Sequence, residues 1–158
     1  MTAVAILAAV VLFLFAGSFF SKRRFGLLGL ALAAGYVLSG LWHDTAEFMV
    51  SALGVFPEGV VTSFIATLAL LLLPALLLFF HGYSYKTVTG RLVGSLLFTA
   101  LAIAFFAEPM SKALVLEGMS VPVFGWIVAN AATVIGVGVM AAVFDVFLSK
   151  PVRLASKK

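Results

Sequence analysis

The stretch FAGSFFSKRRFGLLGL, residues 15–30, places three consecutive cations between two long apolar runs. The run before the cations covers residues 2–20 and the run after them residues 25–42, and a helix that crosses a bilayer needs about 20 such residues. Three further apolar runs follow, at about 60–80, 91–107 and 123–147. We therefore predict a single domain over 1–158, an all-α integral membrane protein with a compact bundle of five transmembrane helices. A four-helix alternative stays open because the second and fourth runs are short.

Composition supports the membrane class. The chain of 158 residues is 64% hydrophobic and 10% charged, with a mean hydropathy of +1.25, whereas charged residues make up about 25% of a soluble domain. The net charge of +4 does not indicate nucleic-acid binding, because the cations stand at the ends of apolar runs, where they serve topology and anionic lipid headgroups. The absence of cysteine excludes disulfides, thiolate metal sites and thiol nucleophiles.

The charges alternate between the connections. Every Lys and Arg except Lys112 falls within residues 22–24, 86–91 or 150–158, and every acid except Asp145 falls in the other two connections. Under the positive-inside rule this predicts an N-terminus outside and a C-terminus in the cytoplasm of a plasma (bacterial inner) membrane. Residues 2–20 are interpreted as a retained first helix rather than a signal peptide, because the cations follow the apolar run.

The two outer connections, 43–59 and 108–118, each predict a short amphipathic helix. In the first, Asp44 stands three residues before Glu47, a variant of the capping box, and in the second Pro109 suits a first helical turn. Two interpretations stand: these segments cover the outer mouth of the bundle, or they offer a surface to a partner or to lipid.

Small residues spaced four apart allow close approach of spanning helices. Such sets occur in the second, fourth and fifth runs, which we expect to lie inside the bundle. The first run and much of the third are bulky, which suits either lipid exposure or a broader interface. The sets are Ala31, Gly35 and Ser39; Gly90 and Gly94; Gly125, Ala129 and Thr133; Gly138 and Ala142. In the third run Pro74 removes one helical hydrogen bond and predicts a kink, which is either a functional hinge or a static packing feature.

Polar groups within the runs are few. Asp145 is the only acid inside one, near the inner boundary, where Lys150 or Arg153 is in reach. With Asn130 and Thr133 it makes a candidate polar track on the fifth helix. The other interpretation is a neutralised interfacial acid and an Asn that forms an ordinary interhelical hydrogen bond.

Enzyme and metal signatures are sparse. The predicted topology separates His43 from His81, which excludes a site that uses both within one chain. His43 with Asp44 and Glu47 offers metal-compatible ligand types, but the same pattern is typical of a solvated surface. No catalytic motif or phosphate-binding loop is present in the sequence. We predict no catalytic residues, no cofactor and no metal.

Two segments resemble the colicin V production protein family of small bacterial inner-membrane proteins. GSFFSKRRFGLL, 17–28, is similar to that family's basic link between its first two helices, and GRLVG, 90–94, is similar to the start of its fourth helix. This chain lacks two acids typical of the family, having GLL at 26–28 and Gly90 at those places, and it adds a fifth run. The resemblance implies a role in envelope maintenance or in export of a peptide or small solute.

These observations favour a non-enzymatic subunit or accessory of a cell-envelope or export assembly. The expected partners are membrane lipid and other membrane subunits or further copies of this chain. The alternative is a small oligomeric transporter or channel lined by Asn130, Thr133 and Asp145. A lipid enzyme at the inner surface, built on Asp145 and nearby cations, ranks last because no second catalytic group is found.

Overall fold

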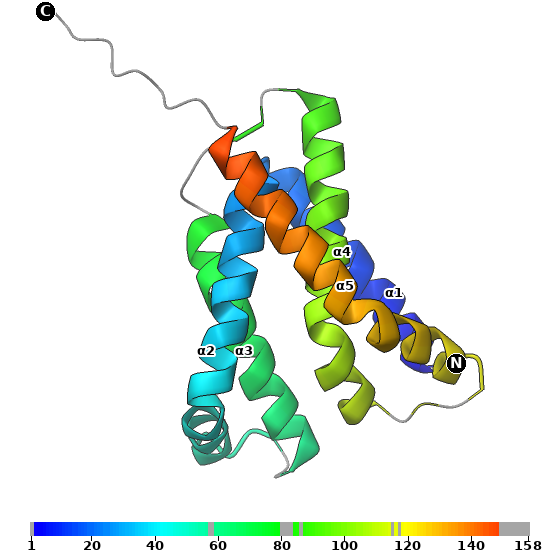
Figure 1. Cartoon of the computed structure of the whole chain (residues 1–158). Coiled ribbons are helices and arrows are strands. Elements are labelled where there is room, and N and C mark those ends of the chain that lie inside the picture. Colours follow the sequence, from blue (N-terminus) through cyan, green and yellow to red (C-terminus); the bar gives the residue numbers. More distant parts are fainter. Residues whose placement is uncertain are drawn as a thin grey trace, which may run out of the picture.

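The computed structural model describes residues 2–56, 59–79, 84, 85, 87–114, 116 and 118–148, and this part of the chain is helical, without a β-strand. Five helices pack in alternating direction (Figure 1). All five are long and apolar enough to cross a membrane, as the sequence predicted. They are α1 (Thr2–Ser21), α2 (Phe25–Ala52), α3 (Val60–Phe79), α4 (Val88–Ala113) and α5 (Ser120–Phe147).

The alternation sorts the charges to the two ends of the bundle. One end, here called the basic end, carries the link 22–24 and residues 84, 85 and 87 together with the last turn of α5. The opposite end, here called the acidic end, carries the last turns of α2 and α4 and the first turns of α3 and α5 (Figure 1). Among the described charges the basic end holds Lys22, Arg23, Arg24, Arg91 and Asp145, and the acidic end holds Asp44, Glu47, Glu108 and Lys112.

The core lies around α2 and α4. Its largest cluster includes Phe25, Leu28, Leu32 and Phe98, all at most 2% exposed. Of the apolar window of each helix, 56% is buried in α4 and 44% in α2, but only 22% in α3, 17% in α1 and 6% in α5. The expectation that α2 and α4 lie inside therefore agrees with the structure, whereas the expectation for the fifth helix is wrong.

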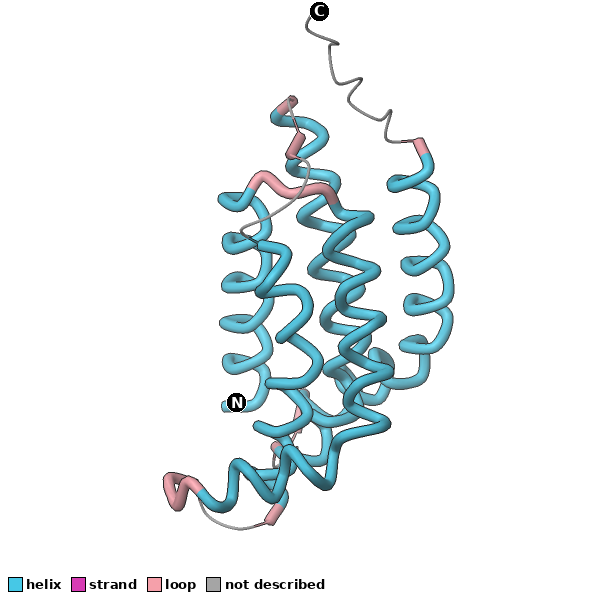
Figure 2. The backbone as a smooth tube through the Cα atoms, turned by 90° about the vertical axis from the view of Figure 1, so that its left-hand side faces the viewer, coloured by secondary structure: helices cyan, strands magenta, loops and turns pink. Residues whose placement is uncertain are grey.

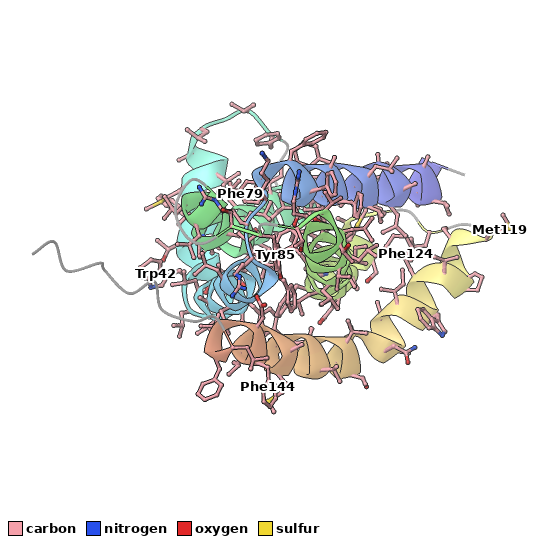
Figure 3. The ribbon with its side chains drawn as sticks, turned by 90° about the horizontal axis from the view of Figure 1, so that it is seen from above. Trp42, Phe79, Tyr85, Met119, Phe124 and Phe144 are labelled. Carbon is pink, nitrogen blue, oxygen red and sulfur yellow. The ribbon has the colours of Figure 1, made fainter. Side chains whose placement is uncertain are left out.

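The reason lies in how α5 crosses the bundle. Near the basic end it packs against α2 and α4, and toward the acidic end it diverges from the α2–α3 pair (Figures 1 and 3). Of its two rows of small residues, the one with Gly138 and Ala142 packs within the chain, and Ala142 is fully buried. The row of Gly125, Ala129 and Thr133 is exposed.

The two predicted amphipathic helices are not separate elements. α2 continues through Asp44 to Ala52, and α4 continues through Pro109 to Ala113. Tertiary contacts account for the continuation: the His43 side chain bonds to α3, and Met110, just after the proline, is 3% exposed in a second apolar cluster. The last turns of α2 nevertheless turn across the end of the bundle (Figure 2).

The apolar face of this terminal part of α2 points away from the bundle. Phe48, Met49 and Leu53 are 73%, 63% and 69% exposed. They therefore do not close the mouth of the bundle. Of the two interpretations of this segment, only an apolar surface that faces outward agrees with the structure.

In α3 the helix runs unbroken through Pro74.

Candidate functional site

A cavity of about 710 Å³ opens near the acidic end, where α5 diverges from α3. Four helices line it: α2 and α3 together supply its polar wall, α4 a charged and aromatic side, and α5 a wall of small and aliphatic residues. The lining residues are Tyr36, His43, Glu47, Gly59, Val60, Ser63, Phe64, Thr67, Ala104, Phe105, Glu108, Pro109, Lys112, Val128, Ala131, Ala132 and Ile135.

The His43 imidazole is the centre of the polar wall. Its Nε2 lies 3.0 Å from the Ser63 hydroxyl and 3.2 Å from a Glu47 carboxylate oxygen, and its Nδ1 lies 3.2 Å from the Thr67 hydroxyl. Both His43 and Glu47 are partly exposed, with side-chain exposures of 33% and 37%. The ring is therefore held from both sides by α3 while Glu47, one turn further along α2, faces the same nitrogen as Ser63.

The Glu47 carboxylate can only accept a hydrogen bond, so a proton on Nε2 serves the 3.2 Å contact between His43 and Glu47. The Thr67 hydroxyl lies within hydrogen-bond distance of both Nδ1 of His43 and the carbonyl oxygen of Ser63.

The sequence predicted only half of this cluster. Asp44, grouped with His43 and Glu47 from their spacing, is exposed and does not line the cavity. Ser63 and Thr67 from α3 take its place, and their spacing of four residues was the one available signal. Among the described residues no group of three or more His, Cys, Asp or Glu side chains is placed to hold a metal ion.

Two further features complete the cavity. On α4 Lys112 donates to Glu108 at 2.7 Å across one helical turn, and both side chains are well exposed. Within the cavity the rings of Tyr36 and Phe105 lie with centroids 5.1 Å apart and tilted by 36°. The lining of the cavity thus includes exposed charges and an aromatic pair.

At the basic end Asp145 binds the start of α2. A carboxylate oxygen accepts from the backbone N–H of Gly26 at 2.9 Å, and the Tyr85 hydroxyl, which donates to the same oxygen at 3.5 Å, accepts from the N–H of Phe25 at 3.2 Å. A carboxylate at a helix N-terminus is stabilised by the free N–H groups and the helix dipole. The partners predicted for Asp145, Lys150 and Arg153, lie outside the described residues, as does His81.

Tyr85 also occupies the space beside Gly90 and Gly94. A Cβ at Gly94 would lie 2.5 Å from its ring, and one at Gly90 would lie 3.0 Å from it. These two glycines therefore accommodate a ring from the link before α4, whereas the sequence predicted that they pack against a helix. Burial, the largest of several causes, raises the pKa of Tyr85 above its ordinary value of 10.0, so its hydroxyl keeps donating to Asp145 throughout the neutral range.

The cations of the basic end bond to the last carbonyls of neighbouring helices. Arg23 donates to the carbonyl of Phe79 at the end of α3, and Arg91 donates to that of Phe19 near the end of α1, each at 3.0 Å. The Arg91 guanidinium also lies 4.6 Å from the centre of the Phe19 ring. Cations at helix C-termini satisfy free carbonyls and complement the dipole, so these residues serve the fold as well as the charge asymmetry.

The predicted polar track is not continuous within the chain. Asp145 faces α2, but Asn130 donates to the carbonyl of Trp126 on its own helix at 2.7 Å, and Thr133 is exposed. Neither Asn130 nor Thr133 lines the cavity. The three residues therefore do not share a site, because α5 turns different faces to α2 and outward along its length.

The other small residues that were predicted to pack approach their neighbouring helices to different distances. A Cβ at Gly35 would meet the backbone of Leu71 on α3, and Ala31 and Ser39 on the same helix are buried. A Cβ at Gly138 would lie 2.8 Å from the flexible end of Leu101, a contact that a side-chain shift can relieve.

No family model matches this chain, and neither a curated protein nor a solved structure matches it.

Proposed function

We propose that the chain is an integral membrane protein of five spans, with its basic end in the cytoplasm and its N-terminus outside. Three observations support this insertion. All five helices have the length and hydropathy of spans, large apolar side chains such as Phe13, Leu41 and Phe144 are more than half exposed, and the described cations gather at one end except for Lys112. The exposed apolar face of Phe48, Met49 and Leu53 fits the outer headgroup region.

Within that membrane the chain acts as a non-enzymatic subunit or accessory of an envelope or export assembly. One observation carries this proposal: between residues 125 and 136 the outward face of α5 has a row of small residues on which no other described part of the chain packs. A Cβ at Gly125 or at Gly136 would meet no atom within 4 Å, and Ala129 and Thr133 lie exposed between them. Such a face lets another spanning helix approach closely, which drives association in lipid.

Asn130 supports the same reading. Its amide stands at the edge of this face and bonds within its own helix, to Trp126. A polar side chain that faces hydrocarbon is costly, and an interhelical hydrogen bond relieves the cost by about 1 kcal/mol. The expected partner is therefore a second membrane protein whose helix offers small residues and a polar group. The resemblance to colicin V production proteins favours an export or envelope pathway for that partner.

Gly136→Leu tests the proposed interface. We expect this variant to fold as the wild type does, because the position is open, and to lose at least ~90% of its captured partner, since leucine prevents close helix approach. The measurement is quantitative mass spectrometry of the tagged protein purified from its native membranes in mild detergent. Gly40→Leu is the matched control, because Gly40 is equally open but lies on α2; equal capture by the two variants would disprove the role of α5.

The cavity favours a second candidate, a small transporter. Asn130, Thr133 and Asp145, the lining that the sequence predicted for a transporter, do not line this cavity. A transport route through the cavity would instead pass His43 and Glu47. An accessory subunit tolerates Glu47→Gln in function. A transporter that uses this route loses flux in that variant while it still assembles, and this comparison separates the two candidates.

A further inference from the structure

We propose that the cavity at the acidic end is a binding site for a hydrophobic organic cation, a molecule with one positive charge and an apolar, ring-containing body. This inference goes beyond the proposed function and does not depend on it, because the cavity lining and the row of small residues on α5 share no residue. Size, wall chemistry and charge each support it.

The volume suits a small organic molecule. Ligand pockets in proteins span roughly 300–1,000 Å³, and this cavity has about 710 Å³. Part of its lining is apolar, with Val60 and Phe64 on α3 and Val128 and Ile135 on α5. An apolar body can therefore leave water or lipid for the cavity without loss of hydrogen bonds.

The charge at the rim selects the sign of the ligand. The described charged residues of the lining are Glu47, Glu108 and Lys112. Lys112 is engaged by Glu108 at 2.7 Å, whereas Glu47 has no Lys or Arg partner among the described lining residues and lies 3.2 Å from Nε2 of His43. A cation beside Glu47 gains a carboxylate partner, whereas an anion would meet two carboxylates and a lysine that is already paired.

The aromatic lining suits the same ligand. Tyr36, which is 52% exposed, and Phe105, whose ring centroid lies 5.1 Å from that of Tyr36, both line the cavity. The faces of aromatic rings attract a soft, weakly hydrated cation, and this attraction strengthens where water is excluded. A metal ion is a poorer fit, because among the described residues no three ligands converge.

The test uses two ions of the same shape and opposite charge. Tetraphenylphosphonium and tetraphenylborate are offered to the purified wild-type protein in zwitterionic lipid nanodiscs, with protein-free discs subtracted, and binding is measured by equilibrium dialysis. We expect saturable binding of the phosphonium at one site per chain and at least a tenfold weaker affinity for the borate. Equal affinity for the two ions, or no saturable binding of the phosphonium, would overturn the proposal.

Two charge-neutralising variants locate the site. Glu47→Gln keeps the shape and hydrogen-bonding capacity of the side chain and is expected to weaken phosphonium binding about tenfold. Asp44→Asn removes the same charge from an exposed neighbour that does not line the cavity, and its affinity should stay within twofold of the wild type. An equal loss in both variants would show a general surface-charge effect and would contradict a site at Glu47.

Discussion

Replacement of Gly35 by leucine is expected to prevent the helices from assembling. A Cβ at this position would lie 2.8 Å from the Cα and carbonyl carbon of Leu71, with the carbonyl oxygen closer still. Since the obstacle is backbone, a rotamer change cannot relieve it, and α2 and α3 must separate where they pack. Overpacking typically costs about 1–3 kcal/mol even where side chains can adjust. We expect Gly35→Ala to lose at least that much, and Gly35→Leu to yield no monodisperse protein in detergent.

Gly40, on the same helix, provides the control. A Cβ there meets no atom within 4 Å, so Gly40→Ala should be neutral or gain up to about 1 kcal/mol from helix propensity. Thermal unfolding of the purified variants, followed by circular dichroism, measures the difference. Equal melting temperatures for Gly35→Ala and Gly40→Ala would mean that α2 and α3 do not approach as closely as described.

Gly26→Ala is expected to detach α5 from the start of α2. The added Cβ would lie 2.6 Å from the carbonyl oxygen of Ala142 and 2.9 Å from the carboxylate of Asp145. It therefore acts on the hydrogen bond that joins Asp145 to Gly26 and on the backbone contact of the two helices at once. We expect a loss of about 3 kcal/mol in stability, the upper end of the usual overpacking range.

The comparison for this variant is Gly136→Ala, which adds the same methyl group to α5 in open space. In urea or thermal unfolding in the same detergent, the free energy of unfolding of Gly136→Ala should stay within about 1 kcal/mol of that of the wild type. Asp145→Asn should have an intermediate effect, because the amide oxygen still accepts from Gly26 but no longer carries a charge at the helix N-terminus. If Gly26→Ala is as stable as Gly136→Ala, Asp145 does not fasten α5 to α2.

Much of the architecture follows from the sequence. The length of the apolar runs predicts five helices, and the alternation of charge between connections predicts which ends lie together; both agree with the structure. The extents of α2 and α4 do not follow in the same way. Asp44 and Pro109 are local signals for a helix start. The helices nevertheless continue past both residues, because His43 and Met110 make contacts with other helices, and local sequence does not reveal such contacts.

The position of α5 shows a second limit. Small residues occur on two of its faces, and composition does not distinguish a face that packs within the chain from one that stays open. The glycine pair at the start of α4 shows the same limit, since Gly94 accommodates the ring of Tyr85 rather than a helix. Spacing predicts that something approaches closely. It does not predict what approaches.

The cavity was not predicted, because its polar wall combines two helices. His43 and Glu47 share a face of α2, and Ser63 and Thr67 share a face of α3, but only the packing of α2 on α3 brings them into hydrogen-bond distance. Helical periodicity identifies each face and leaves the pairing of faces undetermined. The divergence of α5, which leaves the space in front of this wall, depends on contacts made near the other end of the helix.

The measurement that tests the central claim most directly is the membrane topology. The chain contains no cysteine, so single cysteines can be placed at two exposed positions, Lys112 at the acidic end and Ser84 at the basic end. A membrane-impermeant maleimide is then added to spheroplasts of a bacterial host. We predict that Lys112→Cys is labelled in intact spheroplasts and Ser84→Cys only after lysis. Labelling of Ser84→Cys in intact spheroplasts would contradict the account.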